Sequence, residues 1–149
     1  MLVRLIYASR PAKNIGISEV SQIMSVSKHN NQMGNLSGAL IYTEHFFMQC
    51  LEGDRNAVNE AYTRIGKDDR HTDCVLLRYE HVDFRIFGQW SMGQISLGKQ
   101  QNPIVKKYSD HGYFDPYTMN SNQSELFMHD VAKAVTRQQQ TATITNIRN

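Results

Sequence analysis

The sequence predicts an α+β domain whose elements follow the order β-α-β-β-α-β-β. Residues 38–53, GALIYTEHFFMQCLEG, have the composition of two strands joined by a short turn at 43–45. Apolar residues recur at helical spacing before and after this hairpin, and two further strand-like stretches follow the second helix. This order predicts a ferredoxin-like fold with a five-stranded mixed sheet, two helices on one face and a C-terminal helical extension.

The strand expected over 46–51 is apolar on both faces. Successive side chains of a strand point to opposite faces, so Phe47, Gln49 and Leu51 share one face. A strand that is apolar on both faces is covered on both sides and lies inside the sheet rather than at its edge. Gln49 is then a buried amide, and each of its polar groups left without a partner costs about 1–3 kcal/mol. We therefore expect a polar group against that face.

Local signals place the remaining elements of the domain. They predict strands over 1–8, within 74–84 and around 90–95, and helices over 19–28 and 55–65. Ser18 and Asp54 are suited to cap the two helices, because their side-chain oxygens accept hydrogen bonds from the first backbone N–H groups. Gly66 is placed to follow the second helix as its C′ residue. Trp90 and Met92, two residues apart in the last predicted strand, share a face.

The chain changes character after residue 97. A short helix is expected at 104–108, and Asn122 followed by Glu125 resembles a capping box ahead of an apolar stripe that includes Phe127 and Val131. This stripe predicts one or two helices packed on the free face of the sheet or on a partner. The predicted units are a sheet domain at 1–97, a helical extension at 98–137 and a disordered tail at 138–149.

Composition argues against several classes of function. The formal net charge of +2 has no Lys/Arg cluster, which argues against a nucleic-acid partner. No apolar run approaches the ~20 residues needed to span a bilayer, and the first residues lack the features of a signal peptide. The six histidines show no metal-ligand spacing. Cys50 and Cys74 are expected to be reduced thiols in a cytoplasmic protein.

Six short motifs carry a resemblance to a known family. In chain order they are RLIYAS, HNN, LSGALIY, FFMQCLEG, RIGKDDRH and QWSMG. Each is short, but their order and spacing over residues 1–97 are specific. The chain resembles the BLUF domain, a family of blue-light sensors that bind a flavin between two helices of a mixed sheet. The resemblance implies that 1–97 is a flavin-binding domain.

The resemblance implies a photoactive role for four residues. Tyr7 matches the tyrosine that donates an electron to excited flavin, and Gln49 matches the glutamine that switches. Trp90 and Met92 match a pair whose exchange of positions accompanies signalling. Tyrosine suits this role because it can lose an electron and then a proton, and glutamine because it carries a donor and an acceptor without charge. The hypothesis is that rotation or tautomerisation of Gln49 strengthens a hydrogen bond to the flavin C4 carbonyl, which predicts a small, reversible red shift.

The resemblance also implies which residues hold the cofactor. Asn31 matches the asparagine that binds the polar edge of the flavin, and Asn30 lies beside it. Three polar residues match positions near the flavin side chain and phosphates, and apolar residues are expected to bury the rings. With Tyr7 and Gln49, the expected cofactor-binding residues are Ile23, Asn30, Asn31, Phe47, Arg64, Ile65, Asp68 and His71. FAD is the expected flavin, with FMN and riboflavin as alternatives.

Two other functions stay open on the sequence. One is a flavin-free ferredoxin-like regulatory module. The other is an acylphosphatase-like hydrolase using Arg10 and Asn31, although residues 8–14 lack the glycines that cradle a phosphate well. The photoreceptor would be yellow, whereas both alternatives would be colourless. As a photoreceptor the protein is not expected to be an enzyme, and its expected partners are a downstream protein and further copies of itself.

Overall fold

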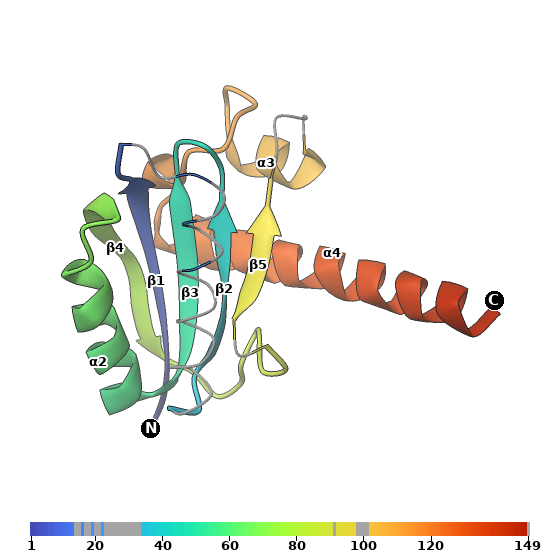
Figure 1. Ribbon diagram of the computed structural model, residues 1–149, viewed down its shortest axis with the longest axis horizontal. Coiled ribbons are helices and arrows are strands. Elements are labelled where there is room, and N and C mark those ends of the chain that lie inside the picture. The colour runs from blue at the N-terminus through green and yellow to red at the C-terminus, as the bar shows by residue number, and fades with distance from the viewer. Residues whose placement is uncertain are drawn as a thin grey trace.

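Five strands form one sheet in the computed structural model, in the order β4-β1-β3-β2-β5 (Figure 1). The described residues are 1–13, 16, 19, 22, 34–90, 92–97 and 102–148, with side chains up to 135. The strands are β1 Leu2–Pro11, β2 Ser37–Tyr42, β3 Phe47–Asp54, β4 His71–His81 and β5 Gly93–Ser96. Neighbouring strands are antiparallel except for β2 and β5, which are parallel, so the sheet is mixed, as predicted.

The predicted central position of β3 is confirmed, because β1 and β2 flank it. Its alternating side chains enter two separate cores. Phe47 and Leu51 join the core that includes Val58 of α2, and Met48 and Cys50 join the core on the opposite face, which includes residues of α4. The alternation of apolar residues in β3 therefore creates both layers of the fold.

Helix α2, Arg55–Gly66, follows β3 directly. The Asp54 side chain accepts a hydrogen bond from the backbone N–H of Asn56 at 3.1 Å, so the predicted cap is confirmed. Gly66 is the last helical residue rather than the residue beyond the helix. Lys67 ends the helix in a right-handed conformation and donates to Arg64 O, so no left-handed glycine is required. The helix predicted over 19–28 and its cap fall largely outside the described residues.

The extension contains α3 Pro103–Tyr108, the 3-10 helix η1 Pro116–Thr118 and α4 Ser121–Arg148. A reciprocal capping box begins α4: Gln123 N donates to Asn120 Oδ1 at 2.8 Å, and Asn120 N donates to Gln123 Oε1 at 3.0 Å. The capping box predicted at Asn122 and Glu125 therefore lies two residues earlier in the sequence, at Asn120 and Gln123. Glu125 lies inside the helix and forms ion pairs with the sheet instead.

Helix α4 packs on the free face of the sheet, as predicted, through Phe127, Met128 and Val131. It passes behind the sheet and continues beyond β5 (Figure 1). Its backbone is helical to Arg148, beyond the boundary expected at residue 137, and the disorder expected over 138–149 stays a prediction. The chain has no glycine or proline after Pro116, and glutamine and alanine favour helix, so nothing in the sequence interrupts α4.

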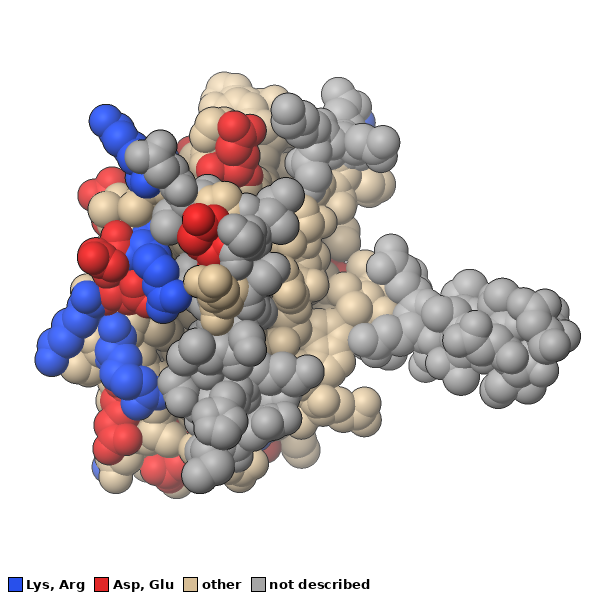
Figure 2. Space-filling view, in the orientation of Figure 1, with Lys and Arg blue, Asp and Glu red and all other residues tan. Residues whose placement is uncertain are grey.

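The described surface on the side shown in Figure 2 carries charges of both signs. Lys and Arg side chains alternate with Asp and Glu over α2 and its surroundings, while the described surface toward β5 is largely uncharged. The described part of this face therefore shows no extended basic patch. In the part of the chain that the structure describes, every helix is too short or too polar to cross a membrane.

Candidate functional site

A tyrosine and a glutamine lie buried side by side on the α2 face of the sheet. Tyr7 in β1 pairs in register with Gln49 in β3, and their side chains are 3% and 4% exposed. The Tyr7 hydroxyl donates a hydrogen bond to Gln49 Oε1. Each group thus satisfies a buried polar atom of the other, which would otherwise lower the stability of the fold. This contact is the polar partner that the sequence required for Gln49.

Met92 extends this pair into a chain of three side chains. Gln49 Nε2 donates to Met92 Sδ at 3.2 Å, and Met92 is 7% exposed. A thioether is a weak acceptor, and a primary amide carries two N–H hydrogens. The amide nitrogen of Gln49 thus retains donor capacity for a stronger acceptor. The site links β1, β3 and the residues just before β5.

Trp90 lies apart from the hydrogen-bonded side chains of Tyr7, Gln49 and Met92. The prediction that Trp90 and Met92 share a strand face is therefore wrong. Strand β5 begins only at Gly93, and Trp90 N donates to Phe87 O across a turn. The Trp90 ring packs on the α4-side core and lies so close to Gly93 that a Cβ there would approach it to 2.1 Å. The alternation of a strand does not extend back to Trp90.

The surroundings of Tyr7 keep its hydroxyl protonated. Burial raises the pKa of Tyr7 well above its usual value, and negative charge on Cys74, Tyr62 or Asp68 would raise it further. The Tyr62 ring lies 5.6 Å from the Tyr7 ring, and the His71 ring lies at 6.3 Å. Tyr7 is therefore a stable hydrogen-bond donor to Gln49 over the whole neutral pH range.

His71 and Asp68, two polar site residues predicted near the end of α2, already bond to other groups of the protein. His71 bridges two elements, with Nε2 2.5 Å from Ile65 O and Nδ1 2.8 Å from Ser9 Oγ. A carbonyl oxygen only accepts, so Nε2 carries the hydrogen in this arrangement. Asp68 forms an ion pair with Arg70 at 2.5 Å, and hydrogen bonds from Arg70 lower the pKa of Asp68.

The remaining predicted site residues divide into two groups. Phe47 is buried in the same core as Tyr7, Ile65 packs against that core, and Arg64 is exposed in the last turn of α2. Ile23, Asn30 and Asn31 lie outside the described residues. The structure therefore brings Tyr7, Gln49, Met92, Phe47, Ile65 and His71 to one side of the sheet.

A buried ion pair on the opposite face was missed by the sequence reasoning. Arg4 and Glu52, 4% and 0% exposed, face each other in β1 and β3, with Arg4 Nε 3.0 Å from Glu52 Oε2. Both interrupt strands that are otherwise largely apolar, and that is the signal that could have revealed them. Arg4 Nη1 also lies 3.5 Å from Glu80, whose pKa falls to about 2, mainly through hydrogen bonding to Arg78.

The fold and the buried, uncharged Tyr7–Gln49–Met92 chain define a small α+β domain with a polar contact inside an apolar layer. The family model described as "Sensors of blue-light using FAD" matches residues 2–93. The chain therefore belongs to the BLUF family, and the resemblance of its motifs is confirmed. BLUF domains are flavin-binding blue-light sensors, and in longer relatives they accompany effector functions.

Three similar proteins illustrate the range of the family. The photoactivated adenylate cyclase subunit alpha of Euglena gracilis is 32% identical over 87 residues, 58% of this chain and 8% of that protein. The blue light- and temperature-regulated antirepressor BluF of Escherichia coli is 29% identical over 113 residues, 75% of this chain and 28% of that protein. The photo-activated state of BlsA superposes with a TM-score of 0.81 at 25% identity, covering 89% of this chain and 95% of that one.

The chain spans less than a tenth of the cyclase subunit and less than a third of the antirepressor, but nearly all of the BlsA structure. The match to the cyclase subunit therefore covers only a small part of that protein. The shared part is the sensor, and the activities named for the longer relatives belong to those proteins.

Proposed function

We propose that this protein is a blue-light photoreceptor that binds FAD against the Tyr7–Gln49–Met92 chain and signals to another protein. The observation that supports this is the hydrogen-bond chain itself: a phenol, an amide and a thioether, all uncharged, buried in one apolar core. A flat apolar ring system with a polar edge requires apolar surroundings and a few well-placed donors and acceptors.

The residues present fit a flavin. Gln49 Nε2 has a hydrogen available beyond the one given to Met92, and a carbonyl on the flavin edge is a stronger acceptor than a thioether. Phe47 and Ile65 would contact the rings, and Asn31, with Asn30 and Ile23, would complete the site from outside the described residues. Arg64, Asp68 and His71 would lie toward the flavin side chain. The family description supports FAD as the flavin.

The proposed switch depends on the two ends of the Gln49 amide. A bound flavin supplies light absorption and, when excited, a strong oxidant. With flavin bound, Tyr7 would be placed to give an electron to the excited ring, and its proton would move along the existing hydrogen bond to Gln49 Oε1. As the electron and proton return to Tyr7, the Gln49 amide would rotate or tautomerise. In the rotated form Gln49 presents its oxygen toward Met92, and the N–H···S hydrogen bond is lost because sulfur is mainly an acceptor.

The direct test is the absorption spectrum of the purified protein in darkness and after blue light. We expect a yellow protein whose flavin bands shift to the red on illumination and return in darkness. FAD released by denaturation and identified by chromatography would establish the cofactor. A colourless protein that takes up no added FAD, FMN or riboflavin would contradict the proposal, as would a flavin spectrum unchanged by light.

Met92 is expected to pass the change in Gln49 to the C-terminal helices. Met92→Leu removes the sulfur and roughly conserves volume, so it should cost less than about 1.5 kcal/mol of stability. We expect it to weaken the light-dependent change in hydrogen exchange of α3 and α4 more than it weakens the red shift. Met119→Leu is the matched control, because Met119 is similarly buried but belongs to the opposite core. Equal responses in wild type and Met92→Leu would contradict this role.

The hydrolase alternative lacks support at Arg10. The Arg10 guanidinium lies 4.5 Å from the Tyr117 ring centroid and 5.1 Å from that of Phe46, and it pairs with Asp73 at 3.6 Å. These contacts connect β1 to the extension rather than forming a phosphate site. We propose instead that the protein is not itself an enzyme and acts through a downstream protein or through self-association.

A further inference from the structure

A fully buried carboxylate, Glu52, holds the backbone that leads to Met92. Its side chain accepts three hydrogen bonds: from Arg4 Nε at 3.0 Å, from Ile86 N at 2.8 Å and from Phe87 N at 2.8 Å. Both oxygens are used, Oε2 by Arg4 and Ile86 and Oε1 by Phe87. A neutral glutamine has a single acceptor oxygen, so it could not reproduce this set. A carboxylate, with its two acceptor oxygens, is therefore needed to bind Arg4 and both successive backbone N–H groups at once.

The described residues 84–90 and Met92 are thus attached to β3 at two points. Near their start, Glu52 holds Ile86 and Phe87; at their end, Gln49 donates to Met92 Sδ. Glu52 and Gln49 lie three residues apart on β3 and face opposite sides of the sheet, because side chains alternate along a strand. Ile86 and Phe87 therefore contact a side chain on one face of β3, and Met92 contacts a side chain on the other.

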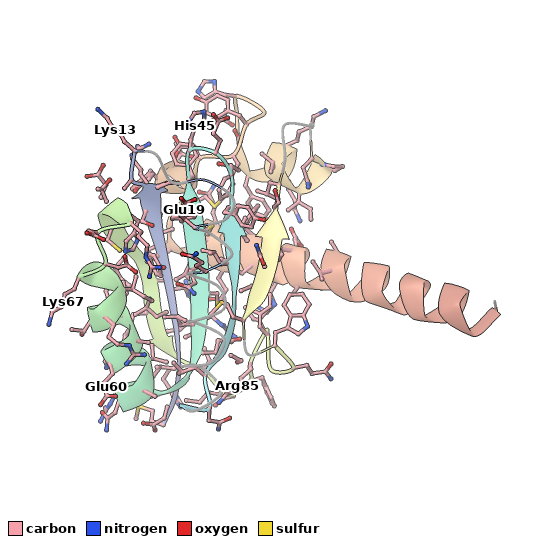
Figure 3. All side chains as sticks on the ribbon, viewed as in Figure 1. Lys13, Glu19, His45, Glu60, Lys67 and Arg85 are labelled. Atoms are coloured by element: carbon pink, nitrogen blue, oxygen red, sulfur yellow. The ribbon has the colours of Figure 1, made fainter. Side chains whose placement is uncertain are left out.

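The course between these two points is constrained by further contacts. Trp90 N donates to Phe87 O at 3.0 Å, and Gly38 N donates to Trp90 O at 3.1 Å. Arg85 lies at the end of the sheet where β2 begins and donates to Ser37 Oγ at 2.9 Å (Figure 3). These contacts tie the described residues between Phe87 and Trp90 to the start of β2, and Met92 follows two residues later.

The same carboxylate is connected to the C-terminal helix. Arg4, the ion-pair partner of Glu52, donates to Phe84 O at 2.9 Å and reaches Glu125 of α4 at 3.4 Å. Glu125 in turn lies 2.5 Å from Arg78 of β4. A shift of the 84–87 segment would therefore alter contacts of Arg4 that also involve α4.

We propose that Glu52 is a positioning residue for the Gln49 switch: by holding the N–H groups of Ile86 and Phe87, it sets the Met92 sulfur against the Gln49 amide. This rests on the proposed photoreceptor function for its light-dependent readout. The Glu52 side chain lies on the opposite face of β3 from Gln49, so the proposed effect on Gln49 runs through Ile86, Phe87 and Met92 rather than through direct contact.

The test combines Glu52→Gln with Met92→Leu and measures the dark-recovery rate of the red shift in both single variants and the double variant. If Glu52 acts through Met92, Glu52→Gln changes the rate about threefold or more when Met92 is present and leaves it unchanged in the Met92→Leu background. A purely structural role predicts no change in rate, or the same fold-change in both backgrounds, and either result would overturn the proposal. Glu80→Gln is the matched control, because Glu80 also contacts Arg4 but none of the 86–87 N–H groups.

A second measurement is independent of photochemistry. With ¹³C-labelled methionine methyl groups, we expect Glu52→Gln to shift the Met92 methyl NMR signal in darkness and to leave that of Met119 in place. Arg85→Gln loosens the same segment without removing the buried ion pair and should also move the Met92 signal, so the test survives if Glu52→Gln does not fold. An unmoved Met92 signal in the variants that fold would overturn the proposal. A wild-type protein without a photocycle would contradict the proposed function, while the NMR result would still decide the role of Glu52.

Discussion

Tyr7→Phe is expected to abolish the light-induced red shift while the protein still binds flavin. Phenylalanine keeps the ring in the core but has no hydroxyl to supply a proton, and its ring is much harder to oxidise than a phenol. The Gln49 oxygen also loses its partner in a site that is almost fully buried, which costs about 1–3 kcal/mol of stability. The measurement is the difference spectrum after blue light, at equal flavin content.

Tyr62→Phe is the matched control for this experiment. The Tyr62 ring lies 5.6 Å from that of Tyr7, so it shares the same surroundings, but the hydroxyl that donates to Gln49 belongs to Tyr7. We expect Tyr62→Phe to retain the red shift. A normal red shift in Tyr7→Phe, or loss of the shift in both variants, would contradict the assignment of Tyr7 as the specific donor.

The two-layer architecture could be predicted because the physical signal lies within single strands. Phe47 and Gln49 on one side of β3, and Met48 and Cys50 on the other, follow the two-residue period of any strand. Asp54 could be predicted as a cap because its role depends on neighbours only two residues away. Local rules succeed where the contacts they describe are local.

The site required contacts that no local pattern describes. Trp90 and Met92 were expected to share one face of a strand, but the Phe87–Trp90 turn precedes β5 and the two side chains lie in different cores. The pairing of Tyr7 with Gln49 depends on the register of β1 against β3, 42 residues apart in sequence. The family resemblance, not the spacing, indicated that these two residues meet.

The Arg4–Glu52 pair shows a different limit of prediction from sequence. Each residue lies at an inward-facing position of a strand that is otherwise largely apolar, so the sequence indicates that both are unusual. It does not indicate that they face each other, because that depends on the register of β1 against β3. Nor does it indicate that Glu52 also holds the backbone of residues 86–87, because that depends on the path of a loop more than 30 residues away. Neither residue lies in the predicted photoactive site, yet both are buried as deeply as Tyr7.

Arg4→Met is expected to be among the most destabilising single changes in this protein. Methionine fills much of the space but leaves Glu52 charged, fully buried and without its cation, and breaking a buried ion pair in this way costs about 3–5 kcal/mol. The midpoint of denaturant unfolding measures the loss. Lys107→Met is the control, because the Lys107–Asp130 pair lies on the surface and should contribute much less.

The double variant Arg4→Met/Glu52→Gln separates the charge from the hydrogen bonds. Glutamine removes the buried charge but accepts through one oxygen only, so one of the two N–H groups of Ile86 and Phe87 loses its acceptor. We therefore expect the double variant to be more stable than Arg4→Met yet less stable than wild type. If the double variant were no more stable than Arg4→Met, the uncompensated charge of Glu52 would not be the cause of the loss. If it equalled wild type, the hydrogen bonds from Ile86 and Phe87 would contribute nothing to stability.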